Sequence, residues 1–236
     1  MMRFDIITIF PKIFNSYFNE SIIWRAQKLR KIKINIIDLR KFSTDRHKKI
    51  DDKPYGGGPG MVFKIEPITK ALQALLNPNS ETRNSKQFLK FKLKKSKPLI
   101  VLFSPGGKQF DSKTAVNFSK KYNHIIMIAG RYEGIDERIK NIIKNLKFEI
   151  GNLSIGPYVL TGGELPAMVV VDAVSRHISG VLGKDESLEE KRLGISVPVY
   201  TRPEVFKWFG KKYSVPKILL SGNHKKIEGW RKIHRK

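Results

Sequence analysis

The stretch SIGPYVLTGGELPAM, from Ser154 to Met168, has a pattern suited to binding a small molecule through the main chain. Gly156-Pro157 and Gly162-Gly163 bracket four residues, YVLT, which look like a fragment of a β-strand. Proline and paired glycines interrupt regular structure because proline fixes φ and glycine frees it. We therefore expect exposed backbone here, with room beside the glycines for a ligand.

Two further glycine-bearing loops follow apolar runs that are typical of β-strands. These loops are FSPGGKQF (103–110) and AGRYEGIDER (129–138), and SIGPYVLTGGE follows a short strand in the same way. Open α/β sheets gather their ligands at the carboxyl ends of strands. The three loops together therefore predict one small-molecule site at one edge of a sheet.

Several common chemistries are excluded by the residue types. The segment DDKPYGGGPGM (51–61) is not followed by Gly-Lys-Ser/Thr, so it is no phosphate loop, and the chain has no G-x-G-x-x-G. The histidines lack metal-ligand spacing. With the charged residues before it, segment 51–61 is consistent with a substrate lid or with a flexible hairpin.

Strand-like and helical segments alternate along the first part of the chain. This alternation predicts an α/β fold with a mostly parallel sheet and helices on both faces. PKIFNSYFNESIIWRAQKLRK (11–31) has a helical pattern, and LPAMVVVDAVSRHI (165–178) is expected to form a buried helix. The four main strand-like runs are 3–10, 33–40, 98–104 and 124–130.

The pattern changes at Gly180, after which about twenty residues show no periodicity. A stretch of this kind is usually a linker or a functional loop. We therefore divide the chain into a main domain at 1–180, an interdomain segment at 181–200 and a small, mainly helical C-terminal domain at 201–236. A domain so small is marginal alone, and we expect it to dock on something.

The overall charge indicates a polyanionic partner. The 236 residues include 46 Lys+Arg against 21 Asp+Glu, a net charge of +25. Nucleic acid is the first candidate, although lysine-rich chains are also common in AT-rich genomes. The absence of cysteine and of any apolar run long enough for a bilayer favours a cytoplasmic protein without a membrane partner.

Seven motifs resemble those of the bacterial tRNA (guanine-N1)-methyltransferases, which belong to the SPOUT superfamily. The resemblance implies S-adenosylmethionine as donor, and the guanine at tRNA position 37 as acceptor. It also implies a C-terminal trefoil knot in the sheet domain and a homodimer whose active sites are shared between subunits. The motifs are DDKPYGGGPGM, GRYEGIDER, SIGPYVLTGGELPAM, DAVSR, GVLG, YTRPEVF and LLSGNHKKIEGWR.

The resemblance also implies which residues hold the donor. Glu133 is expected near its methionine or sulfonium end. Pro157 stands where the family usually has aspartate, but donor binding should survive because this loop acts through its backbone. The implied donor-binding residues are Ser104, Pro105, Gly130, Glu133, Ile155, Gly156, Pro157, Tyr158, Val159, Leu160, Gly162 and Gly163.

Methylation of guanine N1 needs a base for the departing proton and a cation for the charge that develops on O6. The resemblance assigns the cation role to Arg176. The family's catalytic aspartate lies in the interdomain loop, where this chain reads SLEEKRLG. We take Glu190 as its replacement, with Glu189 second and Asp185 third.

Two further expectations follow from the resemblance. Family members usually continue with more helix after GWRKIHRK, so the C-terminal tRNA-binding domain is expected to be shortened. Magnesium is expected to assist catalysis, although no ligand cluster in the sequence places an ion. The alternatives are a related knotted methyltransferase acting on another RNA, and a non-catalytic RNA-binding protein with the same fold.

Overall fold

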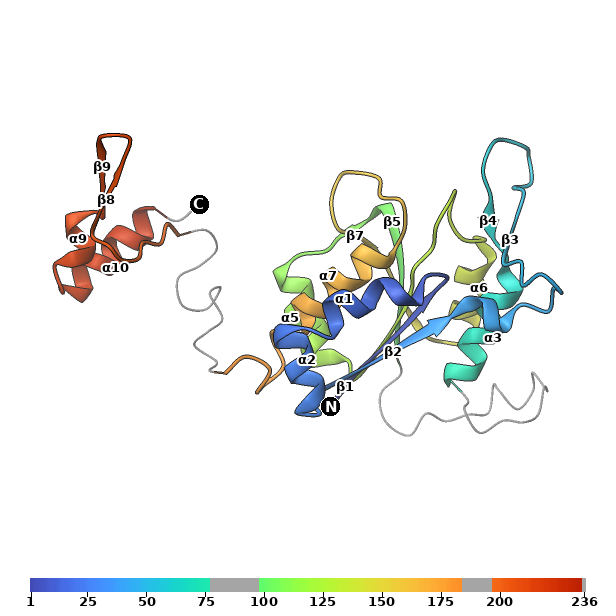
Figure 1. Cartoon of the computed structure of the whole chain (residues 1–236). Coiled ribbons are helices and arrows are strands. Elements are labelled where there is room, and N and C mark those ends of the chain that lie inside the picture. Colours follow the sequence, from blue (N-terminus) through green and yellow to red (C-terminus); the bar gives the residue numbers. More distant parts are fainter. Residues whose placement is uncertain (77–97, 184–196, 235–236) are drawn as a thin grey trace. The chain divides into compact units, whose positions relative to one another are not determined.

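The computed structural model describes residues 1–76, 98–183 and 197–234 (Figure 1). The chain divides into two compact units, Met1–Val181 and Leu182–Lys236, and each is described by itself.

The first unit is built on a five-stranded sheet in the order β2-β1-β6-β5-β7. Every neighbouring pair in this sheet is parallel, so the predicted mostly parallel sheet is confirmed. The strands are β1 (Met2–Thr8), β2 (Ile32–Asp38), β5 (Leu99–Gln109), β6 (His124–Ile128) and β7 (Glu149–Ser154).

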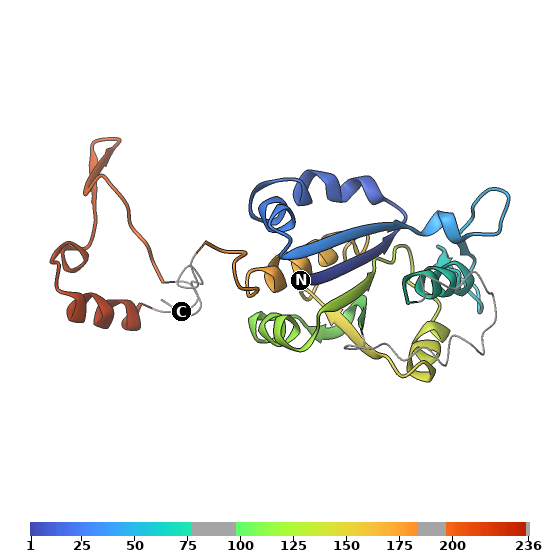
Figure 2. The same cartoon turned by 90° about the horizontal axis from the view of Figure 1, so that it is seen from below.

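Helices cover both faces of this sheet, as predicted (Figures 1 and 2). Successive residues of a strand point to opposite faces, and the strands are apolar on both. Phe4 and Ile6 of β1 therefore join one core cluster, whereas Ile7 joins the other. The first face is covered by α2 (Ser21–Lys28), α5 (Ser112–Lys121) and α7 (Glu164–Ser175), and the second by α3 (Ile65–Leu76) and α6 (Arg138–Asn145).

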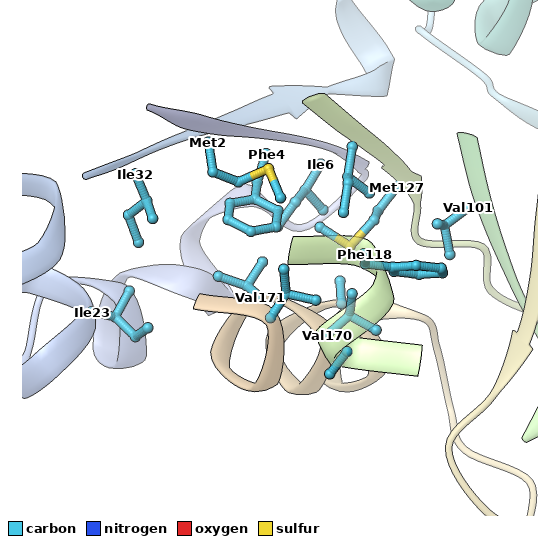
Figure 3. Packing of buried hydrophobic residues seen from close by; sticks show 14 of the residues in the cluster. Met2, Phe4, Ile6, Ile23, Ile32, Val101, Phe118, Met127, Val170 and Val171 are labelled. Atoms are coloured by element: carbon cyan, nitrogen blue, oxygen red, sulfur yellow. The ribbon is translucent and has the colours of Figure 1, made fainter. Parts of the chain in front are cut away.

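Figure 3 shows the first core cluster between the sheet and α7. Side chains of β1 and β6, such as Phe4 and Met127, point toward Val170 and Val171 of the helix, and all four are fully buried. Burial of a side chain of this size contributes about 1.5–3 kcal/mol. This packing fixes α7, and with it the loop that leads into the helix.

Three local predictions were wrong. The helical pattern over 11–31 is divided into η1 (Pro11–Phe14), α1 (Asn15–Phe18) and α2, because the chain turns at Ser21 with a φ of 51°. The residues YVLT form no strand, since no other strand pairs with them among the described residues. Helix α7 is only partly buried: Leu165 is 55% exposed and Val169 43%.

The loop expected at 103–110 is instead an irregular extension of β5. Phe103 and Lys108 both pair with Leu153, so the four residues between them bulge out of the ladder. Gly107 lies so close to β7 that a Cβ there would be 2.7 Å from the carbonyl carbon of Leu153. The bulge brings Ser104 and Pro105 to the carboxyl edge of the sheet.

A small hairpin extends the first unit beside α6. Its strands are β3 (Asp51–Asp52) and β4 (Val62–Phe63), so the glycine-rich segment lies at its tip. The N–H of Phe63 donates to the carbonyl of Gly134 (3.0 Å), and the N–H of Asp136 donates to the carbonyl of Phe63 (3.2 Å). These bonds attach the hairpin to the 129–138 loop.

The second unit contains a hairpin and two helices. Strands β8 (Val205–Trp208) and β9 (Lys211–Ser214) are antiparallel, followed by α9 (Lys217–Leu220) and α10 (His224–Ile233). The sequence predicted the helices but not the hairpin, whose strands have only four residues each. No helix in the described ranges is long and apolar enough to cross a membrane.

A buried carboxylate lies in the first strand. Asp5 is fully buried and accepts hydrogen bonds from Arg3 (3.0 Å) and Asn35 (2.6 Å), and pairs with His124 (2.7 Å). Burial alone would raise the pKa of Asp5, but the hydrogen bonds with His124, Asn35 and Arg3 lower it below its ordinary value. The ionised form is therefore stabilised in the folded protein.

Asp5→Asn is expected to lower the free energy of unfolding by about 2 kcal/mol at pH 7. Because the folded pKa is depressed, this contribution is present above the unfolded pKa of about 3.9 and is lost as the pH falls through the folded value. Urea unfolding of both proteins between pH 7 and pH 3 tests this. A difference that stays constant across that range would contradict it.

Candidate ligand-binding site

A cavity of about 250 Å³ lies at the carboxyl ends of β5, β6 and β7. The structure thus brings the three glycine-bearing loops together, as predicted. Of the twelve residues expected to bind a ligand, only Pro157 does not line the cavity. The others that line it are Ser104, Pro105, Gly130, Glu133, Ile155, Gly156, Tyr158, Val159, Leu160, Gly162 and Gly163.

One wall of the cavity is main chain. Tyr158 folds back on the loop: its N–H donates to the carbonyl of Gly156 (2.9 Å), and its hydroxyl donates to the carbonyl of Ile155 (3.1 Å). Within the described part of the chain, the backbone N–H of Leu160 has no hydrogen-bond partner. A wall of this kind can pair with a planar ligand that has donors and acceptors along its edge, such as a purine.

The 155–163 loop is joined directly to the 129–138 loop. The N–H of Gly163 donates to the carbonyl of Gly130 (2.8 Å), and Arg131 and Gly162 form an isolated antiparallel bridge. A Cβ at Gly163 would lie 2.7 Å from the Cα of Ala129. Glycine is therefore required here for the two backbones to approach.

A buried ion pair holds the same two loops together. Glu164, the first residue of α7, is 2% exposed and accepts hydrogen bonds from Thr8 Oγ1 (2.9 Å) and Arg131 Nε (3.2 Å). The Arg131 guanidinium also lies 4.4 Å from the centroid of the Phe10 ring. We call Thr8, Arg131 and Glu164 the clasp, because these residues fix both cavity loops to the end of β1.

Sequence reasoning missed the clasp. Arg131 and Glu164 both occur in the quoted motifs, GRYEG and GGELP, but they are 33 residues apart. The available signal was a charged residue beside the glycines in each loop, since such a residue needs a partner when it is buried.

Comparison with known proteins gives one consistent result. The model of the family described as tRNA (Guanine-1)-methyltransferase TrmD matches residues 2–236. A tRNA (guanine-N(1)-)-methyltransferase from Dictyoglomus turgidum is 46% identical over 235 residues, covering 98% of this chain and 84% of the relative. Proteins of the same name from Mycoplasmopsis pulmonis and Clostridioides difficile are both 44% identical, covering 98% of this chain and 90% and 91% of their own lengths.

The chain belongs to the tRNA (guanine-1)-methyltransferase family. The resemblance indicated by the seven motifs is therefore confirmed. Members of this family are methyltransferases, so the cavity can be tested as a site for a methyl donor.

An acidic side chain of this methyltransferase family member, Glu133, lies at the cavity beside the glycine-rich hairpin. Glu133 lines the cavity, and its N–H donates to the carbonyl of Met61 (3.0 Å). Its side chain packs so closely on Gly60 that a Cβ there would be 2.6 Å from Glu133 Oε1. The hairpin and the carboxylate are therefore in direct contact.

The structure does not bring Arg176, the proposed catalytic cation, to the cavity of its own chain. Arg176 follows the last residue of α7, whereas the first residue, Glu164, is at the cavity loops. A helix of this length spans ~18 Å, so Arg176 lies far from the cavity of its own chain. Glu190, Glu189 and Asp185 lie outside the described residues.

Exposed apolar side chains gather on neighbouring elements of the first unit. Leu165 and Val169 of α7, Ile13 of η1 and Tyr17 of α1 are each 39–55% exposed. The Tyr17 hydroxyl donates to Asp172 (2.5 Å), which joins α1 to α7 and raises the pKa of Tyr17 to about 12. We call these four residues the apolar face.

The described residues form no cluster that would bind magnesium. In residues 1–76, 98–183 and 197–234, no group of three or more acidic or histidine side chains could hold a metal ion. Mg²⁺ is usually bound by one or two carboxylates with waters and substrate phosphates. The described donor set therefore does not build a dedicated magnesium site.

Breaking the clasp is expected to weaken ligand binding and to destabilise the fold. Glu164→Gln should lower the free energy of unfolding by about 3 kcal/mol, because it leaves the partly buried Arg131 cation without its partner. We expect S-adenosylmethionine affinity, measured by calorimetry, to fall about tenfold as the loops separate.

Glu66→Gln is the matched control, since Glu66 pairs with Lys70 on an exposed helix surface. Exposed pairs contribute little, so this variant should resemble the parent. Equal behaviour of the two variants would show that the clasp does not hold the cavity.

Proposed function

We propose that the protein transfers the methyl group of S-adenosylmethionine to N1 of the guanine at tRNA position 37. The observation that carries this proposal is the cavity at the carboxyl edge of the sheet, walled by the exposed main chain of the 155–163 loop. Family membership supplies the reaction class. The net charge of +25 is consistent with a tRNA substrate.

The donor is proposed to lie in this cavity with its adenine against the 155–160 main chain. Among the described residues, the backbone N–H of Leu160 has no hydrogen-bond partner. It is therefore available to donate to the purine edge. Glu133 lines the same cavity from the 129–138 loop, and its carboxylate would complement the positive charge of the donor's methionine amine or sulfonium. When bound, the donor supplies an electrophilic methyl group.

The acceptor chemistry is proposed to need two further side chains. As the new N–CH₃ bond forms and the S–CH₃ bond breaks, the N1 proton passes to the carboxylate of Glu190. Arg176 stabilises the negative charge that develops on guanine O6. The remaining contribution is positioning of N1 in line with the methyl group, with water excluded.

We propose a homodimer in which Arg176 and Glu190 reach the cavity of the partner subunit. Two observations support this: the distance of Arg176 from its own cavity, and the apolar face on α1, η1 and α7. An exposed apolar surface of this kind is typical of an interface, and a closed twofold dimer is the simplest assembly that would bury it. The dimer would bring the end of one α7 toward the other chain.

The finer architecture is also proposed from the family. It comprises a trefoil knot formed by the loops around the cavity, and a main domain at 1–180. It also comprises an active-site segment at 181–200 and a shortened tRNA-binding domain at 201–236. The bonds between the 155–163 loop and Gly130 are compatible with the knot. We also propose, from the family, that magnesium assists catalysis and that the protein is cytoplasmic.

Methyl transfer from labelled S-adenosylmethionine to a tRNA transcript with guanine at position 37 tests the function. A matched transcript with adenine at that position is the control. We expect label in the guanine transcript alone, with 1-methylguanosine identified after digestion. Label in another RNA, or donor binding without transfer to any RNA, would overturn the proposal and favour one of the two alternatives.

A further inference from the structure

The hairpin of the second unit presents two chemically different faces. Opposed residues of an antiparallel pair share a face, and successive residues alternate between faces. Phe206 pairs with Tyr213, and Trp208 pairs with Lys211, so these four residues share one face. The other face carries Val205, Ser214, Lys207 and Lys212. The hairpin projects away from α9 and α10 (Figure 1).

The aromatic face is open. Phe206, Trp208 and Tyr213 are 51%, 56% and 54% exposed. The rings of Phe206 and Trp208 are nearly parallel, with an interplanar angle of 18° and centroids 6.1 Å apart. Aromatic side chains that are exposed and aligned in this way form a flat surface on which planar groups can stack.

The tip of the hairpin adds a fourth ring in an unusual conformation. Phe209 and Gly210 form a two-residue turn in which both have positive φ, 46° and 74°. Such turns favour Asn-Gly, and a bulky residue at positive φ is strained. Phe209 is nonetheless 88% exposed, with its ring centroid 4.9 Å from that of Trp208. Neither turn chemistry nor core packing accounts for a phenylalanine here.

The charge around the aromatic face is strongly positive. Residues 205–214 contain Lys207, Lys211 and Lys212 and no acidic residue. Between 197 and 234 the sequence has nine lysines and arginines against two glutamates, Glu204 and Glu228. Exposed aromatic rings among lysines are the combination that binds unpaired nucleotides, because bases stack on the rings and phosphates pair with the cations.

We propose that the hairpin 205–214 is a stacking platform for unpaired bases of the RNA substrate, a proposal that rests on the tRNA methyltransferase function. Bases stack on Phe206, Trp208 and Phe209. Lys211 shares the aromatic face and binds the phosphate of a stacked nucleotide, whereas Lys207 and Lys212 bind phosphates on the opposite side. The platform thereby holds the substrate through loop nucleotides and not through a paired stem.

Phe209→Asn and Trp208→Ala in the full chain test the platform. Asparagine suits the positive φ at position 209, so Phe209→Asn removes the ring while keeping or improving the turn. Each variant is expected to bind the guanine-37 tRNA transcript about tenfold more weakly, measured by filter binding. The loss should appear in the KM for tRNA, with kcat and S-adenosylmethionine affinity unchanged.

Salt dependence separates stacking from charge. The two ring variants should keep the parent slope of log Kd against log salt, whereas Lys211→Ala should reduce that slope by about 1.

Trp24→Ala is the matched control for loss of an exposed ring. It removes a tryptophan that is 45% exposed in the first unit, and it should leave tRNA affinity unchanged.

Parent-like tRNA affinity in both ring variants would overturn the platform. A loss of dimer or of donor binding in these variants would also overturn it, because the aromatic face would then pack on protein. These outcomes differ from failure of the proposed function, in which the parent protein itself would not methylate the guanine-37 transcript.

Discussion

Glu190→Gln is expected to lower methyl transfer to the guanine-37 transcript about a thousandfold while leaving donor affinity unchanged. Glutamine keeps the size of the side chain but cannot accept the N1 proton. The proposed base comes from this segment because the described lining of the cavity offers only Glu133 and Glu137 as acids. Of these, Glu133 is assigned to the donor, and Glu137 pairs with Lys140 (2.7 Å). Single-turnover rates with saturating donor and tRNA measure the effect.

Glu189→Gln and Asp185→Asn are the matched controls, since each removes one charge from the same segment. We expect both to retain transfer within about tenfold of the parent, a change attributable to local charge alone. Near-parent turnover of Glu190→Gln would show that Glu190 is not the base. A thousandfold loss in Glu189→Gln instead would assign the role of base to Glu189.

Arg176→Ala is expected to reduce the rate of transfer by a factor of about 100–1000, because the charge on O6 loses its stabilising cation. Arg176→Lys should recover part of the rate, since it restores the positive charge without the bidentate geometry. Donor affinity should stay unchanged in both, because the proposed contact of Arg176 is with guanine O6 and not with the donor.

Mixed dimers show which subunit supplies the arginine. Leu160→Trp fills the donor cavity, so a homodimer of this variant and a homodimer of Arg176→Ala should both be nearly inactive. If Arg176 acts across the interface, a dimer of one chain of each kind contains one complete site. Co-expression with two purification tags should then recover about half of the parent rate.

Activity of the mixed dimer at the level of the two homodimers would assign Arg176 to its own chain. That result would contradict the proposed arrangement, in which Arg176 crosses to the partner's cavity. Size-exclusion chromatography with light scattering tests whether the parent and the variants form the proposed dimer.

The sheet could be predicted from the sequence because β1, β5 and β6 contain apolar runs between clear turn signals. Ile6, Ile126 and Ile100 show the reason: parallel strands buried on both faces need apolar residues at successive positions. The break at Ser21 and the bulge before Lys108 could not be predicted. Both depend on how distant segments pack, which a local pattern does not encode.

The position of the candidate site was predictable for a topological reason, whereas its supporting contacts were not. Loops after parallel strands meet at one edge, so Ser104, Gly130 and Gly162 converge whatever their neighbours are. The pairing of Glu164 with Arg131 could not be predicted, because it depends on the backbone hydrogen bonds that join their two loops. The partners of Asp5 were likewise not predictable, because Asn35 and His124 come from the two neighbouring strands, β2 and β6.

The order of strands in the sheet has a consequence for synthesis on the ribosome. β1 lies between β2 and β6, and 85 residues separate the end of β2 from the start of β6. At ~5–20 residues per second, one edge of β1 stays unpaired for roughly 4–17 s while the chain grows. The nascent chain thus presents the edge of an apolar strand, a hazard for aggregation, until β6 has emerged. Chaperone demand should therefore be highest before β6 is complete and should fall as soon as it pairs.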